Sequence, residues 1–140
     1  MRFLGWHLEK FNSIVTEKSR SPLREENPQK RIEAENALLI FASVEKEDEG
    51  KEKEVVLKTA ELIKEQAKNL GVKNIVIHSF AHLFSQPASP ETALQVLKEL
   101  SRQLKKSGFE VVRTPFGWFN ALEIKAKGHP LSRIAREIRI

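Results

Sequence analysis

Four histidines are the side chains of this chain that suit acid–base or metal chemistry near neutral pH: His7, His78, His82 and His129. His78 and His82 are four residues apart, a spacing that metal-binding helices use, but here they straddle the end of a predicted strand and the loop after it. The chain has no cysteine, and no acid nearby completes a ligand set. We therefore expect no metal, and we expect His78 to be an ordinary interior or sheet-face residue.

His82 lies just past the carboxyl end of that strand, where α/β folds place their binding sites. The pattern leaves two interpretations open: a site residue, or a loop histidine bonded to a backbone carbonyl. Ser43, Ser79 and Ser85 lie near strand ends, but none belongs to a nucleophile elbow or to a base–acid series. The six glycines form no phosphate-cradling loop. A serine hydrolase and a nucleotide hydrolase are therefore not expected.

An apolar turn between Thr114 and Asn120 combines a proline, a glycine and three aromatic residues. Such a turn is costly to expose, so it is either a hairpin that plugs the core or a functional surface. In the functional interpretation it forms a pocket wall, or a platform on which a nucleobase stacks. A second turn, Lys127-Gly-His-Pro-Leu131, combines a histidine with a cation.

Charge is unevenly distributed along the 140 residues. Residues 1–70 contain 13 Lys/Arg and 14 Asp/Glu, a net charge of −1, whereas residues 71–140 contain 11 and 5, a net charge of +6. A basic half suits a polyanionic partner such as nucleic acid. A charge-rich, heat-adapted protein that happens to be basic would show the same count.

Composition sets the broad class. Apolar residues make up 40% and charged residues 31%, which is typical of a soluble globular protein. Without cysteine, a disulfide scaffold, a thiolate zinc site, an iron–sulfur cluster and a cysteine nucleophile are excluded. No apolar run approaches the roughly 18–20 residues of a membrane span, and the N-terminus lacks a signal peptide's apolar stretch. We therefore expect a cytoplasmic protein without membrane contact, and a single domain over residues 1–140.

Periodicity outlines the elements that must position these residues. Residues 52–70 and 90–107 carry helical apolar stripes, with Gly71 as a stop and Ser89 as an N-cap. Strands are expected at 1–11, 36–45, 73–79, 109–113 and 118–126, with a loop at 19–31 and a joining turn at 115–117. Residues 131–140 suit a helix or an edge strand, and the strand is favoured. The expected order is β-β-β-α-β-α-β-β, with a further terminal strand. This predicts an α/β (α+β layered) fold with a single mixed β-sheet and two main helices covering one face.

Taken together, four short motifs resemble a known family. The chain is similar to the N-terminal editing domain of archaeal threonyl-tRNA synthetases over essentially its whole length. The opening Met1-Arg2 and His7 also fit, and the motifs occur in the family's order and spacing: Ser43-Val-Glu-Lys46, Phe80-Ala-His-Leu83, Pro115-Phe-Gly117 and Lys127-Gly-His-Pro-Leu131. The resemblance implies a fold similar to D-aminoacyl-tRNA deacylases, a homodimer, and hydrolysis of L-serine wrongly attached to tRNA(Thr).

The resemblance also implies site residues. Val44 is expected to be the wall that excludes threonine's extra methyl group, and His82 to orient the substrate or to place water. The catalytic positions are His82 and Asn120, and the substrate positions are Val44, Phe80, Ala81, Phe116, Gly117 and Phe119. Lys125, Lys127 and His129 are the expected tRNA contacts. The partner is the serine-carrying 3′ end of tRNA(Thr), with synthetase catalytic domains in cis or in trans. The reaction is an ester hydrolysis helped by the terminal 2′-hydroxyl of the tRNA, with no cofactor.

Two positions depart from the family pattern. Asn120 stands where the pattern has a lysine, and Arg133 stands where it has an acid. Asn120 still forms hydrogen bonds but carries no charge. Either the charge is not essential, or activity is reduced, or Lys125 or Lys127 replaces it. The rival functions that stay open are a non-catalytic tRNA-binding module, a D-aminoacyl-tRNA deacylase and a small-molecule sensor.

Overall fold

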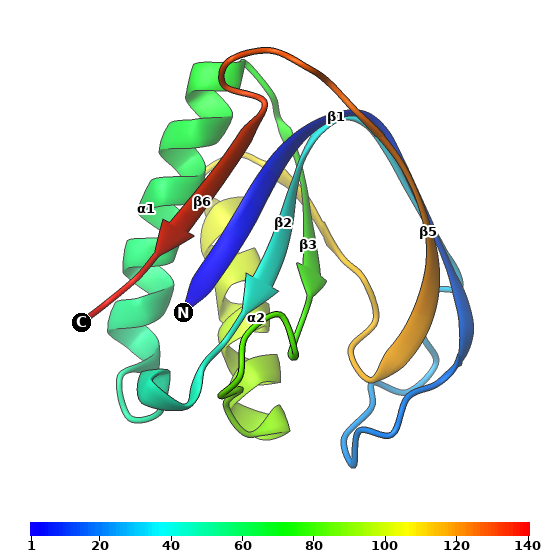
Figure 1. The fold of residues 1–140 in the computed structure, drawn as a ribbon, viewed down its shortest axis with the longest axis vertical. Coiled ribbons are helices and arrows are strands. Elements are labelled where there is room, and N and C mark those ends of the chain that lie inside the picture. The colour runs from blue at the N-terminus through cyan, green and yellow to red at the C-terminus, as the bar shows by residue number, and fades with distance from the viewer.

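One curled, six-stranded mixed sheet carries two long helices on one of its faces in the computed structural model, which describes residues 1–140 (Figure 1). The elements are β1 (Arg2–Lys18), β2 (Arg31–Ser43), a short 3-10 turn η1 (Lys46–Asp48), α1 (Glu52–Leu70), β3 (Asn74–Ser79), α2 (Pro90–Lys106), β4 (Glu110–Arg113), β5 (Trp118–Ala126) and β6 (Arg133–Glu137). The expected fold class, a mixed sheet with two main helices, is confirmed.

Strand β1 organises the sheet, whose order is β4-β3-β2-β1-β5. β2 runs antiparallel to β1 along one edge, while β3 and β4 continue the sheet in parallel. The other edge of β1 is shared: β6 pairs with Arg2–Trp6 and β5 pairs with Leu8–Lys18. The last two strands are therefore successive along one edge rather than neighbours in the sheet.

The structure corrects two expectations. Only two strands precede α1, at the places of the expected ranges 1–11 and 36–45, and not the three of the expected order. The first strand is longer than expected: β1 has 17 residues, with irregular pairing to β5 at Leu8/Lys10 and at Val15/Glu17. The turn at 115–117 does not close a hairpin, since β4 pairs with β3 and β5 pairs with β1. The curl of β1 brings β5 round toward β4, so a short turn joins the two ends of the sheet (Figure 1).

The helices begin and end at the predicted signals. The Ser89 side chain accepts a hydrogen bond from the Thr92 N–H, with Pro90 at the first helical position of α2. Gly71 ends α1 in the left-handed conformation, at φ 68°. The predicted apolar stripes face the sheet and are buried: Val56, Ala60, Ile63 and Ala67 in α1, and Ala93, Leu97, Leu100 and Leu104 in α2.

Two apolar clusters hold the fold together. The larger one fills the space between the helices and the sheet, and it comprises 23 buried residues, among them Phe3, Val44 and Phe116. The smaller one lies on the opposite face, where Phe41 belongs to its 7 buried residues and Ile124 of β5 packs against it. The curled end of the sheet thus covers part of its own second face. Neither helix combines the length and the apolar character needed to span a membrane.

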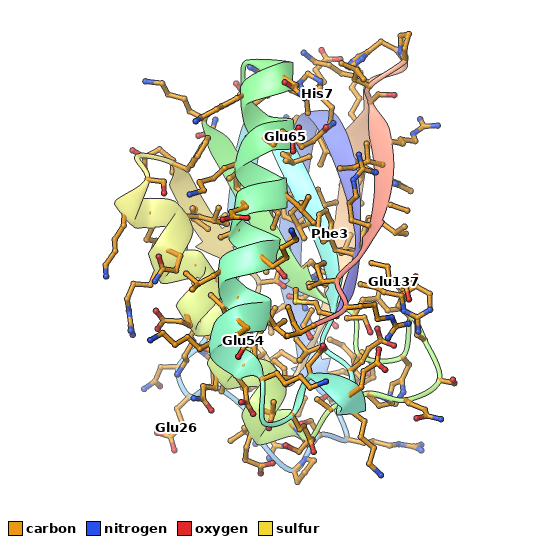
Figure 2. The ribbon with its side chains drawn as sticks, turned by 90° about the vertical axis from the view of Figure 1, so that its left-hand side faces the viewer. Phe3, His7, Glu26, Glu54, Glu65 and Glu137 are labelled. Atoms are coloured by element: carbon orange, nitrogen blue, oxygen red, sulfur yellow. The ribbon has the colours of Figure 1, made fainter.

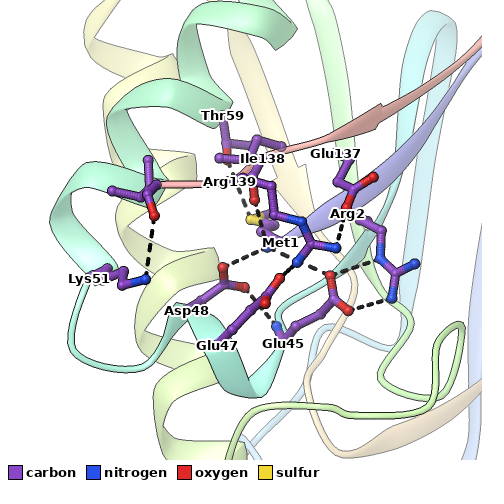
Figure 3. A network of polar contacts seen from close by, with 11 residues as sticks. Met1, Arg2, Glu45, Glu47, Asp48, Lys51, Thr59, Glu137, Ile138 and Arg139 are labelled. Atoms are coloured by element: carbon purple, nitrogen blue, oxygen red, sulfur yellow. Dashed lines mark hydrogen bonds and ion pairs between the residues drawn. The ribbon is translucent and has the colours of Figure 1, made fainter.

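The α-amino group of Met1 is fully buried and fixes the segment that follows β2 (Figure 3). It donates to Asp48 at 2.6 Å and to the Ile138 carbonyl at 3.3 Å. Beside it, Arg2 Nε donates to Glu45 at 2.9 Å. The hydrogen bond from Arg2 lowers the pKa of Glu45 below its ordinary value, although burial opposes this. The network therefore ties β1, η1 and the C-terminal segment together directly after Val44.

Candidate active site

The loop between β3 and α2 starts and finishes beside Val44. The Phe80 N–H donates to the Ala42 carbonyl at 2.8 Å, and the Ala88 N–H donates to the Val44 carbonyl at 3.0 Å. Val44 itself is only 3% exposed. The backbone at the end of β2 therefore holds both ends of the loop that carries Ala81 and His82.

Two consecutive N–H groups of this loop are free. The backbone N–H groups of Ala81 and His82 donate to no other group of the protein, and both residues are exposed. The His82 ring forms no hydrogen bond within the protein, so the alternative of a ring tied to a backbone carbonyl does not hold. Fixed N–H donors beside a free imidazole are groups that can bind a carbonyl oxygen as it gains negative charge.

An aromatic wall lies next to this loop on the second face of the sheet. The Phe41 ring contacts Phe80 and His78 edge-on, at centroid distances of 6.1 and 5.9 Å. His78 Nδ1 lies 2.8 Å from Thr114 Oγ1. Burial lowers the pKa of His78 to about 4, so its ring is neutral at physiological pH. His78 is thus a sheet-face residue, as expected, while Phe80 is 41% exposed.

The apolar turn after β4 has a buried part and an exposed part. Phe116 belongs to the same helix-side cluster as Val44, so it plugs the core, whereas Phe119 is 54% exposed. Gly117 is required between them, because it has φ 83° and a Cβ there would lie 2.5 Å from the Leu23 carbonyl oxygen. The turn therefore contributes both a core anchor and an open aromatic surface.

Glu25 anchors that turn to the loop between β1 and β2. Its carboxylate accepts from Arg113 at 2.9 and 3.0 Å and from the Phe116 N–H at 3.0 Å, and its carbonyl accepts from Trp118 Nε1 at 2.8 Å. Burial would raise the pKa of Glu25, but the bonds from Arg113 and Phe116 outweigh it and lower the pKa. Sequence reasoning missed Glu25, because a polar loop between two prolines gives no sign of a partner 88 residues away.

Asn120 and Arg133, the two departures from the family pattern, are held at different places along β1. Asn120 lies opposite Val15; its Oδ1 accepts from Ser13 Oγ at 3.2 Å and its Nδ2 donates to the Trp118 carbonyl at 3.0 Å. Arg133 lies opposite Trp6, with its guanidinium 5.6 Å from the centre of that ring. The amide of Asn120 is thus engaged at both ends within the protein.

Comparison with known proteins decides the family. The profile of a family described as the Archaea-specific editing domain of threonyl-tRNA synthetase matches residues 1–138. The chain belongs to this family. Similar threonine–tRNA ligases occur in Methanopyrus kandleri (38% identical over 138 residues), Thermococcus onnurineus (42% over 141) and Methanothrix thermoacetophila (44% over 131). These alignments cover 94–99% of the chain but only 19–22% of the relatives, so the chain spans about a fifth of their length.

A solved structure supports the fold of this editing domain independently of sequence. The protein titled c-Myc DNA Unwinding Element Binding Protein superposes with a TM-score of 0.70, covering 100% of both chains. The sequence identity is only 11%, so the likeness concerns the fold alone.

The editing domain places the expected tRNA contacts away from the His82 loop. Lys125 pairs with Glu9 at 3.4 Å, Lys127 donates to Asn36 at 3.3 Å, and His129 Nε2 lies 2.9 Å from His7 Nδ1. By register His7 faces Leu38 within β2, whereas the His82 loop is bound to Ala42 and Val44 at the end of β2. In Figure 1 the segment after β5 crosses the top of the molecule, and the loop after β3 lies toward the bottom.

A hollow of about 550 Å³ also lies away from the His82 loop in this editing domain. Its lining includes Asn74 and Glu110, the first residues of β3 and β4, and Glu35 of the neighbouring strand β2. His82 follows the opposite end of β3, so this hollow is separate from the candidate site. The structure also brings no three His, Asp or Glu side chains together as metal ligands.

Proposed function

We propose that residues 1–140 form one editing domain that hydrolyses L-seryl-tRNA(Thr) and spares threonyl-tRNA(Thr). The observation that carries the proposal is the family match over residues 1–138. In this proposal the domain acts in the cytoplasm as a homodimer, without a cofactor, beside synthetase catalytic domains in cis or in trans. Its partner is the 3′ end of tRNA(Thr) that carries serine.

The need for such a site follows from the size of the two amino acids. Threonine exceeds serine by one methyl group, and a pocket gains only about 1–3 kcal/mol from binding one methyl group. A second site that excludes the larger molecule has no such ceiling, because a methyl group cannot overlap a fixed side chain. Val44 is buried directly after β2, and its carbonyl binds the end of the loop that carries Ala81 and His82. Its rigid position supports the role of the excluding wall.

The proposed reaction is attack of water on the ester carbonyl carbon. The carbonyl oxygen gains negative charge and is stabilised by the free N–H groups of Ala81 and His82. The carbon–oxygen bond to the terminal ribose then breaks, which releases serine and returns a proton to the ribose oxygen. The reaction needs no activated nucleophile from the protein. Ser43 is not suited to be one, because its buried hydroxyl has no hydrogen-bond partner that could take its proton. The terminal 2′-hydroxyl of the tRNA helps to place the water.

A tRNA with a modified end tests this mechanism. Serine is esterified to the 3′-hydroxyl of tRNA(Thr) whose terminal adenosine either carries or lacks the 2′-hydroxyl. We expect hydrolysis well above the buffer rate with the hydroxyl, and a loss on the order of 100-fold without it. Equal rates on the two substrates would contradict the role of the 2′-hydroxyl. The same assay with D-serine distinguishes the D-aminoacyl-tRNA deacylase, which would prefer that ester.

A second candidate function is a tRNA-binding module without catalysis. The observation that favours it is Asn120, whose amide is neutral and is engaged by Ser13 and by the Trp118 carbonyl. The module predicts salt-dependent binding of tRNA with no hydrolysis of either ester. An Asn120→Lys variant sharpens the distinction, because hydrolysis gained only by this variant would show that the native chain binds without catalysis.

A further inference from the structure

The loop between β1 and β2 forms one unit with the turn at the candidate site. Besides the bonds of the Glu25 side chain, the Ser19 N–H donates to the Gly117 carbonyl at 3.1 Å and the Glu25 N–H donates to the Phe116 carbonyl at 3.1 Å. The Arg24 side chain covers Gly117 so closely that a Cβ there would lie 2.5 Å from Arg24 Cγ. The loop thus borders the turn that carries the exposed ring of Phe119.

Two arginines of this loop carry charges that the protein does not neutralise. Arg20 and Arg24 are exposed, and neither forms an ion pair. The Arg24 guanidinium donates one hydrogen bond within the protein, to the Ser21 carbonyl at 2.9 Å. Of the two acids in the loop, Glu25 is neutralised by Arg113. The other, Glu26, extends from the lower end of the molecule, far from His7 (Figure 2).

We propose that Arg20 and Arg24 bind backbone phosphates of the single-stranded 3′ end of the RNA whose last nucleotide enters the site. The inference rests on the proposed function, which requires that end to reach His82. A guanidinium binds phosphate oxygens through paired N–H donors, and an unpaired one loses no internal salt bridge on doing so. Because Glu25 fixes the loop to the turn, the backbone that carries the two arginines has a defined position next to that turn. The turn also carries the exposed ring of Phe119, on which a base can stack.

Binding of a synthetic RNA hairpin with an unpaired 3′ ACCA end tests the inference, with the same hairpin lacking that end as comparison. The double variant Arg20→Ala/Arg24→Ala removes both cations. The control Lys105→Ala/Lys106→Ala removes two exposed cations from the far end of α2, beside the start of β4. At a salt slope of about −0.7 per phosphate contact, losing two contacts weakens binding about 25-fold at 0.1 M salt and reduces the slope by about 1.4.

The expected result is a loss confined to the loop variant and to the RNA with the unpaired end. Arg20→Lys/Arg24→Lys keeps both charges but loses the paired N–H donors, so it should keep the salt slope of the wild type and bind with an affinity between those of the wild type and the alanine variant. Unchanged binding by the alanine variant, an equal loss in the control, or an equal loss with the blunt hairpin would each overturn the inference. Binding is measured with RNA that carries no ester, so the result does not depend on hydrolysis. A chain that binds as expected but hydrolyses no ester would contradict the proposed function and would still support the phosphate contacts.

Discussion

The Glu25 carboxylate binds both terminal nitrogens of Arg113, at 2.9 and 3.0 Å, and so joins the loop after β1 to the end of β4. The same carboxylate accepts from the Phe116 N–H. Phe116 lies in the core with Val44, and the exposed Phe119 follows three residues later. One side chain from an irregular loop therefore sets the place of the turn that borders the candidate site.

Glu25→Gln should destabilise the fold by about 1–3 kcal/mol. The neutral amide weakens the charge-assisted hydrogen bonds between residue 25 and Arg113, which are mostly buried. Urea denaturation of the variant and the wild type measures this loss. The matched control is Glu26→Gln, since Glu26 is exposed and forms no hydrogen bond or ion pair. Equal stability of the Glu25 and Glu26 variants would show that the contact to Arg113 contributes nothing.

Val44→Ala should admit threonine. The smaller side chain leaves room for the methyl group, so the preference for seryl-tRNA(Thr) over threonyl-tRNA(Thr) should weaken by about 1–3 kcal/mol in kcat/KM. Val72→Ala is the matched control, because Val72 is also 3% exposed but precedes β3 at its far end. If the Val44 variant still rejects threonine as the wild type does, another residue forms the wall.

His82→Ala should slow hydrolysis on the order of 100-fold while tRNA binding changes little, because the ring acts on the water or the ester rather than on the RNA. Single-turnover rates and binding constants, measured on the same tRNA, separate the two effects. Ser85→Ala serves as the control, since Ser85 is exposed in the same loop. Losses of equal size in rate and in binding would make His82 a binding residue.

The sequence predicted the helices well because their signals are local. The Ser89 N-cap, the Gly71 stop and the apolar stripes each depend on residues within a turn or two. The strand pairing was harder. Whether β5 pairs with β4 or with β1 depends on how far the sheet curls, and no short segment encodes that.

The candidate site was predictable only in part, for a similar reason. Val44, Phe116 and His82 stand out through family motifs, and the structure places Val44 and Phe116 in one cluster with the His82 loop tied to the Val44 carbonyl. Glu25 has no such motif, since its role depends on a distant arginine. Lys125 and Lys127 stand out by charge, but strand register carries them away from the His82 loop.

His78 should make stability depend on pH between about 6.5 and 4. Its pKa is lowered to about 4 in the folded chain by burial, and lies near 6.5 when unfolded. Protonation therefore favours the unfolded chain. The contribution of the neutral His78 to the free energy of unfolding is complete above about pH 6.5, and it falls by about 3 kcal/mol as the pH drops to about 4. The lowered pKa values of Glu25 and Glu45 mean that these carboxylates stabilise the fold while ionised, and this stabilisation is lost only as the pH falls below about 4.5.

Urea denaturation at several pH values measures this dependence. His78→Gln cannot titrate, so it should lose most of the slope between pH 6.5 and 4.5, whereas His82→Ala, at an exposed ring, should keep it. A slope in His78→Gln as steep as in the wild type would contradict the assignment to His78.

The most direct test of the account compares the deacylation of seryl-tRNA(Thr) and threonyl-tRNA(Thr) by the isolated chain, on the same tRNA and without added metal. An editing domain with the proposed specificity removes serine fast and spares threonine. Loss of neither ester while tRNA is still bound, or equal loss of both, would contradict it: the first would make the site a recognition module, and the second would remove the sieve at Val44.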